Sequence, residues 1–230
     1  MSEVRDCWAV VVAAGSGSRM GEGIPKQFRM LAGRSVLAWS LEALRAAPRI
    51  VGIAVVLPPD SELAEAGIAP ADDLIPVEGG AERMDSVAAG LAALRAAGAA
   101  DAARVLVHDG ARPCLPADSL ARLLDAANGP GGALLALPMS DTVKRAEGEV
   151  VADTLDRAAL WRAQTPQCFP LGTLAAAIDA AQSAGAVCSD EAQAMERAGY
   201  HPRLVRGDAR NIKLTTPDDW PLAAWLLESA

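Results

Sequence analysis

Short, unbroken apolar runs alternate along this chain with longer segments whose apolar residues recur at helical spacing. The runs are rich in Val, Leu, Ile and Ala and occupy residues 8–14, 50–57, 104–108 and 132–137. A strand that is apolar on both faces must be covered on both sides, as in a mainly parallel sheet between two layers of helices. The pattern therefore predicts an α/β fold with a mainly parallel sheet and helices on both faces.

Helical periodicity fills the intervals between these runs and continues after them. The first helices are expected at residues 35–47, 85–97 and 117–127. Later elements are expected as helices at 171–184 and 190–198, and as short strands at 203–206 and 211–214. For a last helix, Thr216 is the expected N-cap, with Pro217 in the first turn.

The segment after the fourth apolar run has a different pattern. Residues 142–145 and 149–155 flank a Glu-Gly-Glu turn and predict a two-stranded hairpin. Few of its side chains could reach the main core, and a hairpin without a core of its own is marginally stable. We therefore expect a single domain over residues 1–230 with an inserted β-arm at about 138–160, which packs against a second subunit.

Composition and charge narrow the classes of function. The chain of 230 residues is 51% hydrophobic and 22% charged, which predicts a globular protein. Its net charge of −8 argues against a nucleic-acid or anionic-membrane surface, because both need a broad excess of Lys and Arg. Neither nucleic acid nor a membrane is an expected partner, so an anionic ligand should be small and bound locally.

Cysteine and histidine are few. The four cysteines have no C-x-x-C spacing, which favours isolated thiols in a reducing cytoplasm over a disulfide framework or a zinc site. His108 and His201 are the only histidines, so a multi-histidine metal centre is excluded. We expect a cytoplasmic protein without a metal site built from its own side chains.

A glycine-rich segment follows the first apolar run. It is A-A-G-S-G-S-R-M-G at residues 13–21, and P-K-Q follows at residues 25–27. Backbone N–H groups of such a loop can bind phosphate, and Arg19 and Lys26 would add positive charge. The glycine spacing is one residue longer than the dinucleotide fingerprint and does not match the P-loop. A tight strand-to-helix connection is the structural alternative, but the two cations favour phosphate binding.

A second polar segment, V-H-D-G-A-R-P at residues 107–113, ends the third apolar run. Ligands of open parallel sheets bind at the carboxyl ends of strands, so Asp109 could meet a ligand hydroxyl or a divalent cation and Arg112 a phosphate. A capped turn with a surface Asp–Arg pair explains the segment equally well. His108 is expected to be a packed structural residue and not a base.

Other candidate residues are dispersed and individually weak. Thr142 and Lys144 stand at the base of the predicted arm, and Arg157 stands on its return. The segments Q-T-P-Q at residues 164–167, N-I-K at 211–213 and G-G-A-E-R-M-D-S at 79–86 are also polar. Exposed cations and ordinary turns are the simpler interpretation of each segment taken alone.

Taken in order, these motifs closely resemble those of the 2-C-methyl-D-erythritol 4-phosphate cytidylyltransferases. The likeness covers nearly the whole chain. The resemblance implies a nucleotidyltransferase Rossmann-like fold with a β-arm that forms a homodimer. It also implies transfer of the cytidylyl group of CTP to methylerythritol phosphate in isoprenoid precursor synthesis, with release of pyrophosphate and with Mg²⁺ bound mainly through the CTP phosphates.

The resemblance also assigns roles to residues by motif position. Arg19 and Lys26 match the family's transition-state stabilisers. Arg157, reaching from the partner subunit, and Lys213 match the residues that position the sugar phosphate. The residues that match the substrate pocket are Ala13, Ala14, Gly15, Gly80, Ser86, Asp109, Arg112, Thr142 and Thr165. Ala81 stands where some members carry Asp.

Three alternatives remain open at this point. The acceptor could be another polyol phosphate, such as ribitol phosphate. The chain could bind a nucleotide without catalysis, although Arg19, Lys26 and Lys213 are all present. A dinucleotide-dependent dehydrogenase is disfavoured by the glycine spacing and by Lys26.

Overall fold

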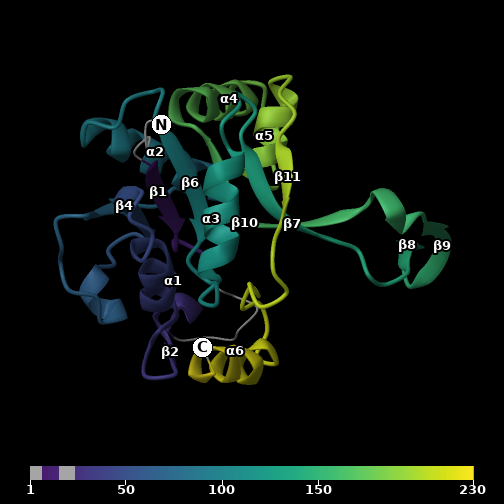
Figure 1. Cartoon of the computed structure of the whole chain (residues 1–230), viewed down its shortest axis with the longest axis horizontal. Helices are drawn as coiled ribbons and strands as arrows, with labels where there is room; N and C mark the ends of the chain where they lie inside the picture. Colours follow the sequence, from purple (N-terminus) through teal and green to yellow (C-terminus); the bar gives the residue numbers. More distant parts are fainter. Residues whose placement is uncertain (1–6, 16–23, 230) are drawn as a thin grey trace.

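The computed structural model describes residues 7–15 and 24–229. Its centre is a seven-stranded sheet in the order β11-β7-β10-β6-β1-β4-β5 (Figure 1). The strands are β1 (Cys7–Val12), β4 (Ile50–Leu57), β5 (Leu74–Glu78), β6 (Arg104–Asp109), β7 (Ala133–Pro138), β10 (Trp161–Pro170) and β11 (Arg203–Arg206). Neighbouring strands are parallel, except that β10 runs antiparallel to both β6 and β7. This arrangement confirms the predicted α/β class.

Helices cover both faces of the sheet and explain its apolar runs. On one face, α1 (Val36–Arg45) and α3 (Ala117–Ala126) pack against side chains such as Val11. On the other face, α2 (Arg83–Ala96), α4 (Leu171–Ser183) and α5 (Glu191–Arg197) pack against neighbours such as Val10. Successive strand residues point to opposite faces, so a strand buried on both sides must be apolar at every position.

Shorter elements complete the body. They are the 3₁₀ turns η2 (Lys26–Phe28) and η3 (Leu63–Ala66), the short strands β2 (Met30–Leu31) and β3 (Arg34–Ser35), and the last helix α6 (Asp219–Glu228). A small apolar cluster joins α6 to the body through Leu31, Val36 and Leu214. At the start of α1, the Ser35 hydroxyl accepts a hydrogen bond from the Ala38 N–H at 3.2 Å, so the helix begins where the sequence predicts.

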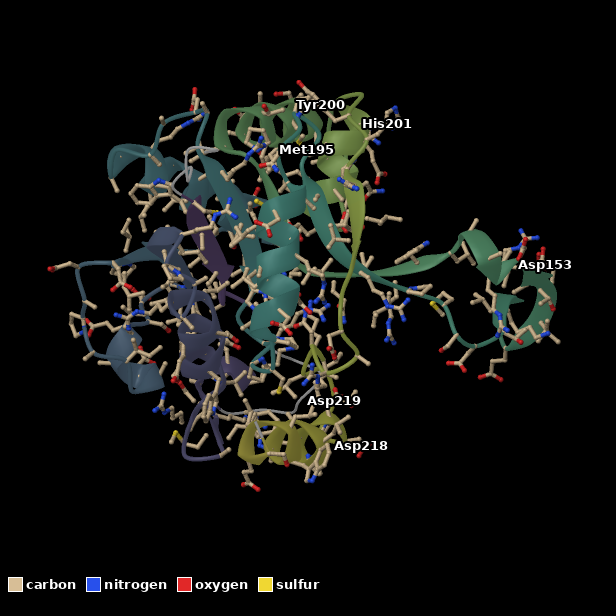
Figure 2. All side chains as sticks on the ribbon, viewed as in Figure 1. Asp153, Met195, Tyr200, His201, Asp218 and Asp219 are labelled. Atoms are coloured by element: carbon tan, nitrogen blue, oxygen red, sulfur yellow. The ribbon has the colours of Figure 1, made fainter. Side chains whose placement is uncertain are left out.

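The predicted hairpin is present and projects away from the body (Figure 1). It consists of β8 (Val143–Glu147) and β9 (Val150–Leu155), and η4 (Arg157–Ala159) leads from it to β10. Figure 2 shows Asp153 on this hairpin, remote from the sheet. Val150 and Val151 are 71% and 61% exposed, so the arm has no core of its own within this chain.

The structure corrects several details of the sequence prediction. β10 was not predicted as a strand, because its polar side chains hide the pattern. Residues 211–214, predicted as a strand, are irregular: the Asn211 side chain donates to the Thr165 carbonyl, and the Leu214 N–H donates to Ala111, at 2.8 and 2.9 Å. Thr216 is not the N-cap of α6, because the helix begins at Asp219.

Candidate functional site

Predicted site residues from four distant segments line one cleft of about 190 Å³. The cleft lies where β1 and β6 end, the edge at which open α/β sheets bind ligands. Those lining it are Ala14, Gly15, Lys26, Gly80, Ser86, Asp109 and Lys213. Ala13 is buried beside them, and Arg19 lies outside the described residues. Most of the predicted nucleotide site is therefore brought together.

A larger groove of about 790 Å³ lies elsewhere, between α1 and the loop after η3. Its charged lining residues include Arg34, Glu42 and Arg45, and Arg34 pairs with Glu42 on the surface. None of the predicted site residues lines it. The chemistry of the side chains, and not the size of the hollow, therefore locates the candidate site.

Gln27 holds the start of the glycine-rich segment in place. Its side-chain amide donates to the carbonyls of Ala13 and Gly15, at 2.5 and 3.1 Å. Gln27 is 2% exposed, so these bonds are sheltered from water. The sequence prediction gave no role to Gln27, although it is part of the P-K-Q motif. Its function here is to fix the backbone on which Gly15 faces the cleft.

Lys26 joins the first and last parts of the chain at the cleft. Its Nζ donates to the Leu214 carbonyl at 2.7 Å, next to Lys213 in sequence. Lys26 and Lys213 thus both line the cleft, although the residues are far apart in the chain. Two cations at one edge suit a ligand with several phosphate charges.

The turn before α2 approaches the glycine-rich segment very closely. A Cβ atom on Gly79 would lie 2.3 Å from the Cβ of Ala14, so only glycine fits. The Gly80 N–H donates to the Ser86 hydroxyl at 3.2 Å, and that hydroxyl donates to the Glu82 carbonyl. Ser86 therefore shapes this wall of the cleft as well as lining it.

Asp109 is the electrostatic centre of the site. Its Oδ2 lies 2.9 Å from Lys213 Nζ and 3.4 Å from Arg112 Nε, and its Oδ1 lies 3.2 Å from an Arg83 Nη atom. Burial raises the pKa of Asp109, but the three cations outweigh burial and hold this pKa well below its usual range. Asp109 is therefore a carboxylate at neutral pH.

Thr165 and His108 lie behind Asp109. The Thr165 hydroxyl accepts from the Asp109 N–H at 3.0 Å and lies 3.2 Å from the His108 ring. Burial lowers the pKa of His108 to about 4, although neighbouring Asp109 opposes this, so the ring is neutral at pH 7. Thr165 thus supports the backbone of Asp109 from behind and does not line the cleft. His108 is packed as expected.

Arg112 and the arm residues lie outside the cleft lining. The Arg112 guanidinium donates to the Asn211 carbonyl at 2.8 Å while its Nε faces Asp109. Thr142 and Arg157 are exposed on the arm, where Arg157 donates to the Ser140 carbonyl. Within one chain, the structure does not bring these two arm residues to the cleft.

Arg83 and Glu191 complete the site, but the sequence prediction gave them no role. Arg83 lines the cleft and forms ion pairs with both Asp109 and Glu191. Arg83 falls inside the G-G-A-E-R-M-D-S segment at residues 79–86, whereas nothing in the local sequence marks Glu191. The partner of Glu191 lies 108 positions away in the chain.

The described residues offer neither a cluster of metal ligands nor a membrane span. Over residues 7–15 and 24–229, no group of three or more His, Cys, Asp or Glu side chains is arranged to hold a metal ion. The same residues contain no helix with the length and apolar character to span a bilayer. The four cysteines, Cys7, Cys114, Cys168 and Cys188, are buried free thiols.

Comparison with known proteins identifies the family. Residues 7–229 match the family model described as 2-C-methyl-D-erythritol 4-phosphate cytidylyltransferase. The chain belongs to this family. Proteins with that name from Acidithiobacillus ferrooxidans and Halorhodospira halophila are 49% and 50% identical, over 96% of this chain and 95% and 93% of theirs. The cytidylyltransferase resemblance is thereby confirmed over nearly the full length.

Solved cytidylyltransferase structures have the same fold. The 2-C-methyl-D-erythritol 4-phosphate cytidylyltransferase of Thermus thermophilus matches with a TM-score of 0.80 and 35% identity, over 96% of this chain and 98% of that one. The enzyme of Francisella tularensis matches with a TM-score of 0.84 and 32% identity, over 96% and 99%. The cleft around Asp109 therefore sits on a cytidylyltransferase scaffold.

Proposed function

We propose that this chain transfers the cytidylyl group of CTP to 2-C-methyl-D-erythritol 4-phosphate and releases pyrophosphate. The observation that carries the proposal is the meeting of Lys26, Lys213 and the Gly80–Ser86 turn in one cleft on a cytidylyltransferase scaffold. The product is 4-diphosphocytidyl-2-C-methyl-D-erythritol, an intermediate of isoprenoid precursor synthesis.

The reaction does not need a general base. A phosphate monoester has a second pKa near 6, so at neutral pH the acceptor is largely a dianion. One of its oxygens attacks the α-phosphorus of CTP in line, and the bond from that phosphorus to the bridging oxygen breaks as pyrophosphate leaves. This agrees with a site in which the nearby histidine, His108, is buried and neutral.

The protein's main task is to hold two anions together. Lys26, with Arg19, stabilises the charge that develops on the α-phosphoryl oxygens and the leaving pyrophosphate. Lys213, with Arg157 of the second protomer, positions the acceptor phosphate, and Lys213 exchanges its Asp109 partner for that phosphate. Orientation of two bound reactants also removes much of the entropic cost of their encounter.

Mg²⁺ would be supplied to the site mainly with the bound nucleotide. Mg²⁺ in nucleotide sites keeps several waters and binds through one or two carboxylates together with phosphate oxygens. Asp109 is an ionised carboxylate that lines the cleft, and CTP supplies the phosphates. When bound, Mg²⁺ neutralises charge on the phosphate oxygens. We propose that Mg²⁺ is held mainly by the CTP phosphates and water, because both oxygens of Asp109 are already paired with cations of the protein.

A homodimer would complete the site through the arm. The exposed valines of β9 need a cover, and a second copy of the chain can supply it. In that dimer, Thr142 and Arg157 of one protomer reach over the cleft of its partner and bind the sugar phosphate. We also propose a cytoplasmic location, which the buried free thiols support.

One assay tests the proposed reaction. The protein is incubated with Mg²⁺, each of the four nucleoside triphosphates and a panel of polyol phosphates, and pyrophosphate release is measured. Release is expected with CTP and methylerythritol phosphate. Equal or faster pyrophosphate release with ribitol phosphate would contradict methylerythritol phosphate as the preferred acceptor. Pyrophosphate release without any acceptor would contradict the transfer reaction.

A further inference from the structure

Glu191 is a fully buried carboxylate that the reaction described above does not use. It is 0% exposed and is the first residue of α5. Its two oxygens accept hydrogen bonds from two nitrogens of the Arg83 guanidinium, one of them at 3.3 Å. A buried charge is costly unless it is paired. Burial accordingly raises the pKa of Glu191, and the charge and hydrogen bonds of Arg83 oppose that rise without cancelling it.

The position of Glu191 is fixed by its neighbours. Gln167 of β10 donates to Asp190 at 2.9 Å and accepts from the Ala192 N–H at 2.8 Å. Asp190 also caps α5 by accepting from the Gln193 N–H at 2.9 Å. The residues on either side of Glu191 are thus tied to the central sheet, so its carboxylate is presented to Arg83 from a rigid place.

Arg83 connects this buried carboxylate with the cleft. The Nη2 atom that bonds Glu191 also lies 3.2 Å from Oδ1 of Asp109. Burial lowers the pKa of Arg83, but the carboxylates of Glu191 and Asp109 outweigh it and leave the pKa above its ordinary value. Arg83 is therefore a cation shared between two anions, one behind the cleft and one in it.

The two carboxylate oxygens of Asp109 have different partners. Oδ1 is occupied by Arg83, whereas Oδ2 faces Lys213 at 2.9 Å. Oδ2 also faces Arg112 at 3.4 Å. The orientation of the Asp109 carboxylate thus sets which oxygen meets the cations of the acceptor side.

We infer that Glu191 is a positioning residue for this site: by holding Arg83 at the back of the cleft, it orients Asp109 and keeps the Arg83 charge away from the bound triphosphate. The inference rests on the proposed cytidylyl transfer, since the benefit is a correctly placed nucleotide. Without Glu191, Arg83 is drawn toward the phosphates of CTP, because its side chain is already 28% exposed. CTP would then bind well but in a poor position for attack.

A double-mutant cycle tests this inference in the intact protein. The variants are Glu191→Gln, Arg83→Met and the double variant, with Arg95→Met as the matched control. Arg95 lies on the same helix and pairs with Asp101 on the surface, away from the cleft. Circular dichroism and melting temperature are measured for each variant, together with kcat and both KM values.

The expected result separates positioning from simple damage. Glu191→Gln should lower kcat about tenfold or more without raising the KM for CTP, because binding is kept and placement is lost. The double variant should lose no more than the worse single variant, because Glu191 acts through Arg83. Arg95→Met should match the wild type. The double variant also replaces the whole ion pair by neutral side chains of similar volume, so it should fold even where a single variant does not.

Three results would overturn the inference. The first is a wild-type kcat in Glu191→Gln, and the second is a double variant whose loss of kcat equals the product of the two single losses. The third is a KM for CTP that rises as the melting temperature falls. A wild type that releases no pyrophosphate would instead remove the proposed function. In that case calorimetric titration with CTP and Mg²⁺ decides the inference. Tighter binding by Glu191→Gln supports it, because the released Arg83 charge reaches the phosphates, and equal or weaker binding overturns it.

Discussion

Lys213 Nζ lies 2.9 Å from Oδ2 of Asp109, so a cation proposed to bind the acceptor phosphate already has an anionic partner in the protein. The Lys213 side chain is 41% exposed and that of Asp109 only 9%, which makes the lysine the partner that can move. A phosphate dianion entering the cleft competes with Asp109 for this ammonium group. In the absence of acceptor, the ion pair therefore holds the Lys213 ammonium group in the cleft.

Replacement of Lys26 tests the transition-state role. We expect Lys26→Ala to lower kcat by on the order of 10² or more, because a cation at the α-phosphate is lost. The fold should remain, since the hydrogen bond from Lys26 to the Leu214 carbonyl lies in a partly buried position. Steady-state kinetics and circular dichroism provide the check, with Arg95→Ala as the control. A kcat close to that of the wild type would exclude the role.

Replacement of Arg157 tests the contribution of the arm. Arg157→Ala should raise the KM for the sugar phosphate and leave the KM for CTP unchanged, because the arm is proposed to contact only the acceptor. The matched control is Arg145→Ala on the same arm, where Arg145 pairs with Asp153 on the surface. A changed KM for CTP alone would contradict the assignment.

Mixing two impaired variants, assayed at a sugar-phosphate concentration at which each alone is nearly inactive, tests whether the site is shared between protomers. Lys26→Ala and Arg157→Ala proteins are combined, allowed to exchange subunits and assayed. If Arg157 acts on the partner's cleft, a mixed dimer has one complete site, and random exchange should restore about a quarter of wild-type activity. Mixed dimers without recovered activity would place Arg157 in the cleft of its own chain. Light scattering before and after exchange confirms that dimers form.

The start of α6 gives a prediction for stability and pH. The Asp219 carboxylate accepts hydrogen bonds from the N–H groups of Thr215 and Thr216, at 2.7 and 2.8 Å. Burial raises the pKa of Asp219, but these bonds outweigh it and lower the pKa below its ordinary value. Asp219→Ala should therefore reduce the free energy of unfolding by about 1 kcal/mol at pH 7.

The pH dependence of this effect follows from the sign of the shift. A carboxyl whose pKa is lowered by folding stabilises the protein above its unfolded pKa, and this contribution disappears as the pH falls through the folded value. The difference between wild type and Asp219→Ala in urea denaturation should thus be smaller at pH 3 than at pH 7. The neighbouring Asp218 makes no capping bond at this helix start, so Asp218→Ala is the control (Figure 2). An equal effect of the two variants would argue against the capping role.

The sequence predicts those elements whose apolar pattern is unbroken. The bounds of β4 and β11 match the predicted ranges, 50–57 and 203–206. β10 is missed because its buried polar residues include Gln164 and Gln167, whose side-chain amide nitrogens donate to partners that no local pattern reveals. Thr216 resembles a helix cap, but α6 begins at Asp219, whose carboxylate accepts a hydrogen bond from the Thr216 N–H.

In the site, too, the residues that follow a local pattern are predictable and those that depend on long-range contacts are not. Gly15, Lys26 and Asp109 could be anticipated, because residues that follow parallel strands meet at one edge of the sheet. The contact between Glu191 and Arg83 could not, because it depends on how α5 packs against the start of α2. Buried ion pairs between distant helices leave no periodic trace in the chain.

β10 is the strand that leads from the arm into the middle of the sheet. Its neighbour β7 leads out to the arm, so both legs of the arm are rooted in adjacent strands of the sheet. Along the same strand, the Thr165 hydroxyl bonds the backbone of Asp109. One continuous strand therefore carries both the root of the arm and the side chain that supports the backbone of Asp109.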